Sequence, residues 1–182
     1  MLYIIGGKYK KRSLVAPKSD IVRPTTSQVR EAVFNICQLS IEGARFLDLF
    51  AGSGAMGLEA LSRGAVHATF VEQNRVALAA IKQNIQILHV EEQTSVLKQD
   101  VFIALQNLAD QEKTYDVIYV DPPYGKGLSG PVLTFLDTHP LLTPGSSLFI
   151  EDADLKLPYL THLTLHSERS VGRAHLYEFR VH

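Results

Sequence analysis

The chain has 182 residues, 46% of them hydrophobic, with a formal net charge of −1, a single cysteine and no tryptophan. A domain holds roughly 100 to 200 residues, so this composition predicts one soluble globular domain and excludes disordered, fibrous and membrane-spanning classes. No signal peptide, disulfide pair or metal-ligand spacing is present, so we expect a cytoplasmic protein without a metal or a membrane partner.

The N-terminal segment differs in charge from the rest of the chain. Residues 1–30 carry seven positive side chains and one acid, a net charge of +6, whereas the other 152 residues carry 11 positive side chains and 18 acids, a net charge of −7. Short apolar runs at 2–5 and 13–16 flank the basic stretch and predict a small β appendage. Charge asymmetry of this kind is typical of an arm that binds a polyanion.

An amphipathic helix is predicted over residues 26–39. Thr25 and Gln28 have the spacing of a capping box, and apolar residues recur from Val29 to Cys37 at helical intervals. The cysteine lies on the apolar face of this helix, so we interpret it as a core residue rather than a nucleophile.

Short apolar runs then alternate with helical stretches. Strands are predicted at 45–50, 68–71, 95–98, 117–120 and 148–150, with helices at 55–63, 74–88, 101–109 and 128–138 between them. This alternation is typical of an α/β fold with a parallel sheet. The segments 161–166 and 174–181 alternate with period two and predict a C-terminal antiparallel hairpin at the sheet edge, which brings the sheet to seven strands.

Residues 46–57 read as a strand, a glycine-rich turn and a helix start. Gly52, Gly54 and Gly57 spell G-x-G-x-x-G, and such a turn lets backbone N–H groups approach a ligand at the positive end of a helix. Glu72 ends the second strand, where an acid can accept hydrogen bonds from ribose hydroxyls. These features suit a dinucleotide as well as S-adenosylmethionine, and a lone glycine pattern also occurs in packing turns.

Asp48 distinguishes between the two cofactors. A carboxylate at the end of the first strand would repel a pyrophosphate, whereas S-adenosylmethionine has a sulfonium cation, an ammonium group and no phosphate. The alternative role for Asp48 is to cap the helix or complement its dipole. Asp100 follows the third strand, where it can bind an adenine amino group, cap the next helix, or do both.

A second motif, Asp121-Pro122-Pro123-Tyr124, follows the strand at 117–120, at the edge where open α/β sheets bind ligands. The prolines lack N–H donors and expose backbone carbonyls, so Asp121 and the Pro122 carbonyl can hold both N–H groups of an exocyclic amine. The amine lone pair then points at a methyl donor. Tyr124 offers a stacking face worth about 1–3 kcal/mol per base. The alternative is a purely structural Pro-Pro turn.

Taken together, these motifs resemble those of class I S-adenosylmethionine-dependent methyltransferases that modify planar exocyclic nitrogens. More narrowly, the chain resembles the RsmD family of bacterial small-subunit (16S) rRNA guanine-N2 methyltransferases. The matching segments are 4–12, 23–26, 29–31, 34–35, 47–54, 57–64, 71–72 and 121–124. The Arg-Pro-Thr segment at 23–25 is the narrower marker, because many amino-methyltransferases share the later motifs.

The resemblance implies a Rossmann-like fold, with a basic β-hairpin arm at 1–24 and a methyltransferase domain at 25–182. It implies that S-adenosylmethionine is bound by Asp48, Phe50, Ala51, Gly52, Ser53, Gly54, Glu72, Asp100 and Val101, and that Asp121, Pro122, Pro123 and Tyr124 handle the guanine amine. From the charge pattern and the resemblance we predict RNA contacts at Lys8, Lys10, Lys11, Arg12, Arg23, Thr25 and Arg30. The implied substrate is small-subunit rRNA, within an assembling or assembled subunit, for a monomeric enzyme.

Other functions remain open on the sequence. An adenine-N6 or a protein glutamine methyltransferase could use the same four-residue signature. A nicotinamide-dependent oxidoreductase is disfavoured by Asp48 and by the Asp-Pro-Pro-Tyr loop, which has no part in hydride transfer. A catalytically silent RNA-binding module is a further alternative, and a basic run is also often only a solvated surface.

Overall fold

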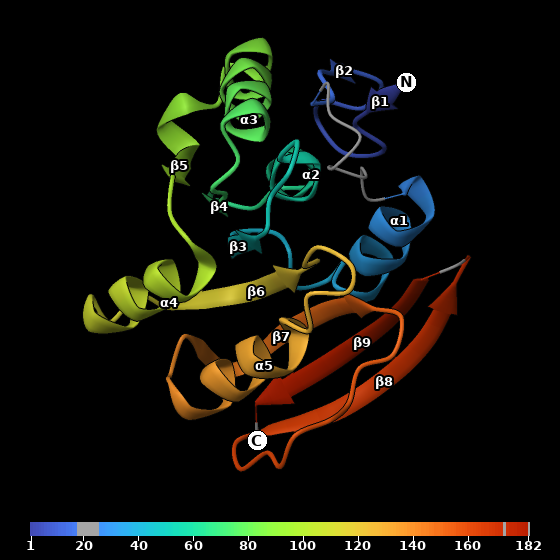
Figure 1. The fold of residues 1–182 in the computed structure, drawn as a ribbon. Coiled ribbons are helices and arrows are strands. Elements are labelled where there is room, and N and C mark those ends of the chain that lie inside the picture. The colour runs from blue at the N-terminus through green and yellow to red at the C-terminus, as the bar shows by residue number, and fades with distance from the viewer. Residues whose placement is uncertain (18–25, 173, 182) are drawn as a thin grey trace.

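The computed structural model describes residues 1–17, 26–172 and 174–181 (Figure 1). Its helices are α1 (Ser27–Ile36), α2 (Ala55–Ser62), α3 (Arg75–Leu88), α4 (Val101–Asp110) and α5 (Ser129–Thr138), with a short 3-10 turn at Glu91–Gln93. Its strands are β1 (Leu2–Tyr3), β2 (Ser13–Leu14), β3 (Arg45–Leu49), β4 (His67–Val71), β5 (Thr94–Leu97), β6 (Tyr115–Val120), β7 (Leu142–Asp152), β8 (Leu163–Val171) and β9 (Ala174–Val181). The predicted strands and helices of the α/β body are therefore all present, although several of their ends differ from the predicted bounds, and the helix predicted over 26–39 ends at Ile36.

The main sheet has seven strands in the order β5-β4-β3-β6-β7-β9-β8. The pairs from β5 through β7 are parallel, while β9 pairs antiparallel with both β7 and β8. The strand order reverses beside β3, because the chain runs outward to β4 and β5 and then returns to β6 on the other side. Ligands bind at such a reversal in open α/β sheets, outside the carboxyl ends of the strands.

Two helical layers cover the sheet (Figure 1). On one face, Val117 and Tyr119 of β6 join a buried cluster with residues of α1, α2 and α3. On the other face, Ile118 and Val120 join a cluster with residues of α4 and α5. Strand β6 is thus apolar on both faces, as the sequence predicts for a central parallel strand between two helix layers.

The start of α1 differs by one residue from the predicted capping box. Thr26 is the N-cap, and its hydroxyl accepts a hydrogen bond from the backbone N–H of Val29 at 3.3 Å. The capping role predicted for Thr25 therefore belongs to its neighbour. Thr25 and Thr26 are neighbours, and the periodicity of the apolar residues does not decide which of the two is the N-cap.

The N-terminal strands β1 and β2 form a separate two-stranded sheet, and we call residues 2–14 the basic hairpin. The hairpin is docked on α2: the carboxylate of Glu59 accepts hydrogen bonds from the backbone N–H groups of Ile5 and Gly6, each at 2.8 Å. Ser62 accepts a further bond from the N–H of Tyr9 at 2.9 Å. The predicted domain boundary after residue 24 lies outside the described residues.

The chain leaving the hairpin is tied to the glycine turn by Asn84 of α3. The Asn84 side chain, which is fully buried, accepts from the N–H of Val15 at 2.7 Å and donates to the Val15 carbonyl at 2.9 Å. It also donates to the carbonyl of Ser53 at 3.0 Å. One amide therefore joins the hairpin to the turn after β3.

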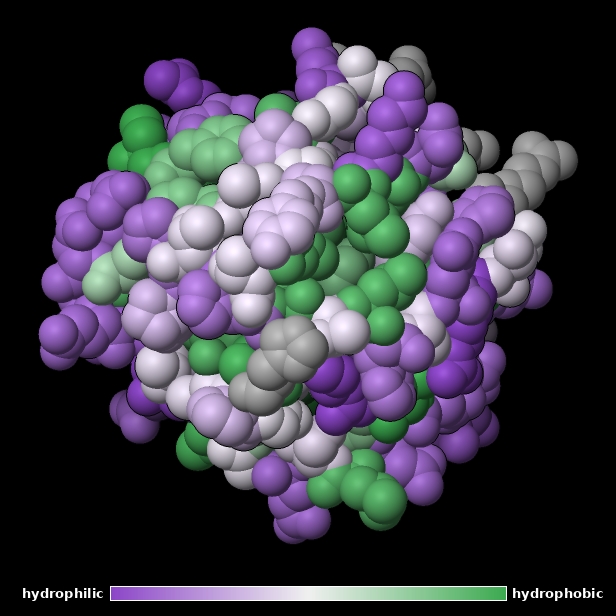
Figure 2. Space-filling view, turned by 90° about the horizontal axis from the view of Figure 1, so that it is seen from below, coloured by the Kyte–Doolittle hydropathy of each residue, from purple (hydrophilic) through white to green (hydrophobic). Residues whose placement is uncertain are grey.

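The surface seen from below Figure 1 mixes hydrophilic residues with several separate groups of apolar ones (Figure 2). On that view the described residues do not form the broad, continuous apolar surface that obligate subunit interfaces bury. None of the helices within the described ranges combines the length and the hydrophobicity needed to cross a membrane.

Candidate active site

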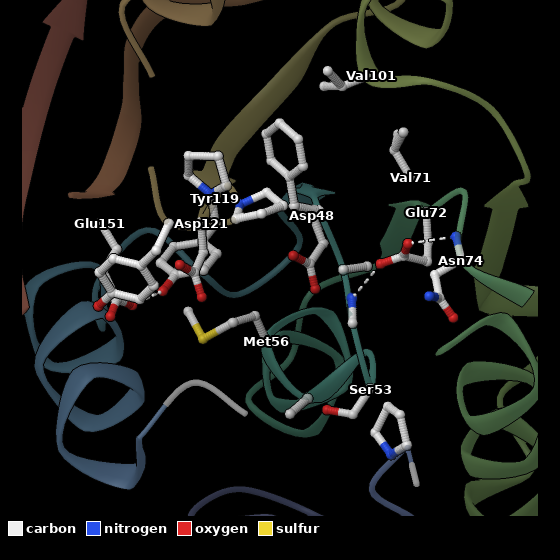
Figure 3. A pocket seen from close by; sticks show the side chains of 18 of the residues that line it. Asp48, Ser53, Met56, Val71, Glu72, Asn74, Val101, Tyr119, Asp121 and Glu151 are labelled. Atoms are coloured by element: carbon white, nitrogen blue, oxygen red, sulfur yellow. Dashed lines mark hydrogen bonds between the residues drawn. The ribbon is translucent and has the colours of Figure 1, made fainter. Parts of the chain in front are cut away.

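A cavity of about 950 Å³ opens at the carboxyl ends of the parallel strands. It is lined by residues in or just after the last residues of β3, β4, β5 and β6, by Glu151 near the end of β7, by the start of α1, and by the turn between β8 and β9. Most of the residues predicted for the cofactor and all four predicted for the amine therefore meet in one space, of which Figure 3 shows a close view. Gly54 and Asp100 are the two predicted cofactor residues that do not line it.

The glycine turn that follows β3 has three residues with positive φ, at alternate positions. Phe50 has φ of 63°, so β3 ends at Leu49, one residue earlier than the sequence predicts. Gly52 and Gly54 have φ of 56° and 77°. A bulky residue with positive φ is uncommon and is tolerated where surrounding structure holds it, often at a functional site.

Gly57 serves packing rather than direct ligand contact. A Cβ atom at this position would lie 2.4 Å from Cε1 of Phe70, so only glycine allows α2 to lie this close to β4. The close approach also brings the N–H of Gly57 to 3.1 Å from Oδ2 of Asp48. The last glycine of the motif thus sets the position of the helix and of the acid.

Asp48 is 1% exposed and lines the cavity. Its burial raises the pKa of the carboxyl well above its usual value; the hydrogen bond from Gly57 opposes this, and the charges of Asp121 and Glu72 add to it. Such a carboxylate is stabilised by a cation in the cavity and destabilised by another anion. The site therefore favours a sulfonium or ammonium ligand over a pyrophosphate.

Glu72 follows β4 and lies beside the glycine turn. Its Oε2 accepts from the N–H of Gly52 at 2.9 Å, and its Oε1 accepts from the N–H groups of Gln73 and Asn74 at 2.9 and 2.7 Å. These bonds fix the carboxylate at the cavity wall, as Figure 3 shows. A carboxyl oxygen has more than one lone pair, so the group can still accept from ribose hydroxyls.

Asp100 is the N-cap of α4, and its Oδ1 accepts from the N–H of Phe102 at 2.9 Å. The residues on either side of it, Gln99 and Val101, line the cavity, and Asp100 itself does not. The capping role is thus present in the structure. The adenine contact of Asp100 stays a prediction, and Gln99 is an additional polar side chain that the motif reasoning missed.

The Asp-Pro-Pro-Tyr loop lines the cavity with all four of its residues. Asp121 is half-buried and Pro122 is buried, while Tyr124 is 60% exposed at the rim. Tyr124 is therefore placed where a base entering from solvent would meet its ring. The roles of these residues in handling the amine remain predictions.

The cavity also contains polar residues that the sequence does not predict, and two of them are hydrogen-bonded to each other. Tyr119 of β6 and Glu151 of β7 are both buried, and the Tyr119 hydroxyl donates to Oε2 of Glu151 at 2.6 Å. The neighbouring Thr26 and Gln28 of the α1 start also line the cavity. Tyr119 and Glu151 lie inside apolar strand sequences, and Glu151 becomes visible only once β7 is known to lie beside β6.

The predicted RNA contacts fall into three groups. Lys8, Lys10, Lys11 and Arg12 are exposed on the basic hairpin. The predictions for Arg23 and Thr25 lie outside the described residues. Arg30 requires a correction: it is 2% exposed, its Nη1 donates to the Tyr3 carbonyl at 3.0 Å, and it lies 3.8 Å from Glu59. A side chain held in this way does not reach RNA at the surface, and it stabilises the docked hairpin instead.

These observations fit S-adenosylmethionine. A buried acid with a raised pKa faces the cavity, a strained turn brings backbone groups close to it, and a second acid stands one strand away for the ribose. In this arrangement Asp48 and the turn would hold the charged part of the cofactor, and Glu72 the ribose. The methyl group carried by the cofactor is the electrophile that an amine in the adjoining part of the cavity requires.

Replacing Asp48 by asparagine will weaken cofactor binding and stabilise the empty protein at neutral pH. A raised carboxyl pKa contributes stability at low pH that is lost as the pH rises through the folded-state value, and asparagine removes that loss. Losing the charge costs about 1.5–3 kcal/mol of cofactor affinity, or roughly 10- to 150-fold. Thermal unfolding with and without S-adenosylmethionine measures both effects; a variant with unchanged cofactor-induced stabilisation would contradict the assignment.

Comparisons with known proteins agree with this arrangement. A family model described as "Conserved hypothetical protein 95" matches residues 2–180. The chain is 37% identical over 156 residues to "Putative rRNA methyltransferase YlbH" of Bacillus subtilis, covering 85% of each protein. It is 35% identical over 172 residues to "Ribosomal RNA small subunit methyltransferase D" of Escherichia coli, covering 93% of this chain and 85% of the relative.

A solved structure is similar over nearly the full length. "Putative methyltransferase yhhF from Escherichia coli" superposes with a TM-score of 0.84 at 29% identity, covering 99% of this chain and 97% of the other. The match therefore includes the basic hairpin as well as the seven-stranded sheet. With the family model matched over residues 2–180 and the identity to methyltransferase D, the chain belongs to the RsmD family of rRNA methyltransferases.

Proposed function

We propose that this protein transfers a methyl group from S-adenosylmethionine to the exocyclic N2 amine of a guanine in small-subunit ribosomal RNA. The observation that carries the proposal is the shared cavity, in which Asp48 and the Asp121 loop both take part. Asp48 is suited to binding a cationic nucleoside, and the Asp121 loop is suited to binding an amine. The relatives named as rRNA methyltransferases support RNA as the substrate class.

In the proposed reaction, Asp121 and the Pro122 carbonyl accept the two N–H groups of the amine and thereby orient its lone pair. That lone pair would form the new N–C bond as the C–S bond of the cofactor breaks and the sulfur keeps the bonding electrons. The proton that the amine loses would pass through the Asp121 carboxylate to solvent. The Asp121 carboxylate stabilises the charge that develops on nitrogen, and positioning supplies much of the remaining acceleration.

No covalent enzyme intermediate is needed. Cys37 is 1% exposed in the core beneath α1, and its burial raises the pKa of the thiol to about 11. A protonated, inaccessible thiol does not act as a nucleophile.

The basic hairpin is proposed to bind RNA beside the cavity. Its exposed basic side chains lie on a hairpin that is docked to α2. Just after the hairpin, Asn84 holds Val15 by two hydrogen bonds, and Pro17, two residues further on, lines the cavity. We propose that an RNA strand bound on the hairpin continues into this cavity, whose lining also includes Tyr124. We also propose that the substrate is a small ribosomal subunit, assembling or assembled, and that the enzyme works as a cytoplasmic monomer.

Changing Lys10, Lys11 and Arg12 together to glutamine will flatten the salt dependence of RNA binding. Each lost phosphate contact reduces the magnitude of the slope of log affinity against log salt concentration by about 0.7 to 0.9. The slope for the triple variant should therefore be smaller in magnitude than the wild-type slope by up to about 2 to 3. Binding titrations between low and moderate salt measure the slope. The control is Lys113→Gln, which changes an exposed lysine just before β6, at the amino ends of the parallel strands and away from the cavity. Equal slopes for wild type and the triple variant would place the RNA elsewhere.

The proposed function is tested by incubating the protein and labelled S-adenosylmethionine with small subunits, naked rRNA and DNA. We expect label in rRNA. Label confined to DNA or to protein would contradict the proposal. Thermal unfolding with S-adenosylmethionine or with NAD distinguishes a methyltransferase from an oxidoreductase, because only a cofactor that binds raises the unfolding temperature. We expect S-adenosylmethionine to raise it.

A further inference from the structure

Glu151 is a carboxylate in the cavity for which the proposed reaction has no use. It is 8% exposed near the end of β7, and it lines the same cavity as Asp121. The register pairs Val120 of β6 with Ile150 of β7, so Asp121 and Glu151 come next on the two parallel strands. Figure 3 shows both side chains in the part of the cavity that also contains Asp48 and Met56.

The carboxylate is oriented by a strand neighbour. The Tyr119 hydroxyl donates to Oε2 of Glu151 at 2.6 Å. Among the described residues, Tyr119 is the one donor to the Glu151 carboxylate. Burial raises the pKa of Glu151, and the bond from Tyr119 opposes that rise. A buried carboxylate is costly unless donors satisfy it, so the group is suited to a ligand that brings N–H donors.

Guanine presents such donors in the required arrangement. On its Watson–Crick edge the N1–H lies directly beside the N2 amine, whereas the N1 of adenine is an acceptor. We propose that Glu151 accepts the N1–H of the target guanine while Asp121 holds the N2 amine, so that Glu151 selects guanine, with Tyr119 as its positioning residue. This inference rests on the proposed function and adds to it the group that reads the base.

The geometry explains why selection is expected. A base whose N1 carries a lone pair would place that lone pair against the Glu151 carboxylate, which would then receive no hydrogen bond from the base. Sites built to hydrogen-bond a polar group reject analogues that lack it far more strongly than apolar pockets reject a change of size. An acid beside N1 therefore favours guanine over a base with an acceptor at N1, and Asp121 alone does not supply this selectivity.

The test uses 2-aminopurine, which keeps the N2 amine but has an acceptor at N1. The guanine that the wild-type enzyme methylates is first mapped, and a synthetic RNA carries 2-aminopurine in its place. For the wild-type enzyme, kcat/KM should be higher with the guanine RNA than with the 2-aminopurine RNA by about a hundredfold or more. In Glu151→Gln the amide oxygen can still accept from Tyr119 while the amide N–H₂ faces N1, so the preference should narrow at least about tenfold.

Two further variants complete the design. Tyr119→Phe keeps the ring and removes the hydroxyl, so it should narrow the preference partially and without loss of fold. Glu168→Gln makes the same chemical change on β8, at a side chain that is 50% exposed, and should leave the preference unchanged. Thermal unfolding of each variant identifies any loss of structure; if Glu151→Gln fails to fold, the preference of Tyr119→Phe decides.

The outcomes separate the two levels of the proposal. If wild type forms no N2-methylguanosine in unmodified RNA, the proposed function fails and the role of Glu151 fails with it. If wild type methylates guanine but the folded variants lose activity equally on both bases, the proposed function stands and the selection by Glu151 is overturned.

Discussion

Replacing Asp121 by alanine will lower the rate of methyl transfer to RNA by about a hundredfold or more, while the affinity for S-adenosylmethionine changes little. The reason is positional: Asp121 follows β6 in the amine part of the cavity, whereas Asp48, near the end of β3, and Glu72, just after β4, are the acids proposed to hold the cofactor. Single-turnover transfer of a labelled methyl group measures the first quantity, and calorimetric titration with the cofactor measures the second.

Two comparisons sharpen this result. Asp121→Asn keeps an oxygen that accepts an N–H but removes the negative charge, so it should retain more activity than alanine. Asp110→Ala, at the exposed end of α4, removes an aspartate away from the cavity and should leave transfer unchanged. An Asp121→Ala enzyme with near-wild-type turnover would end the assignment of this residue to the amine.

Replacing Glu59 by alanine will destabilise the protein by about 3–5 kcal/mol, the range for breaking a buried ion pair from one side. Glu59 is fully buried, with Arg63 at 2.8 Å and Arg30 at 3.8 Å. Its loss also removes the acceptor of the Ile5 and Gly6 N–H groups, and burial already lowers the pKa of Arg30. Urea unfolding measures the loss of free energy.

The matched control is Glu31→Ala on the exposed face of α1, which should change stability by less than about 0.5 kcal/mol. Because Glu59 docks the basic hairpin, the Glu59 variant should also bind RNA more weakly at a temperature where it is still folded. A Glu59→Ala protein as stable as the Glu31 control would contradict the view that this carboxylate holds the hairpin on α2.

Much of the fold follows from sequence patterns with clear physical causes. The alternation of short apolar runs with helical stretches predicts the parallel sheet, and the period-two tail predicts β8 and β9. The end of β3 is missed by one residue because the positive φ of Phe50 depends on the turn around it. Likewise, the α1 cap falls on Thr26 rather than its neighbour, a choice that local spacing does not decide.

The candidate site divides in the same way. Asp48, Glu72 and Asp121 stand out because each is an acid at the end of a predicted strand. Arg30 was assigned to RNA because its charge was visible, while its burial against Glu59 depends on how the hairpin packs on α2. Glu151 was missed for a related reason, since its importance arises from the pairing of β7 with β6.

The central claim is tested most directly by the identity of the methylated product. Small subunits or their rRNA are treated with the enzyme and labelled S-adenosylmethionine, digested, and separated into nucleosides and amino acids. We predict that the label is recovered as N2-methylguanosine and that Asp121→Ala lowers its rate of formation by about a hundredfold or more. Recovery as N6-methyladenosine or methylglutamine would contradict the assignment of the cavity to guanine.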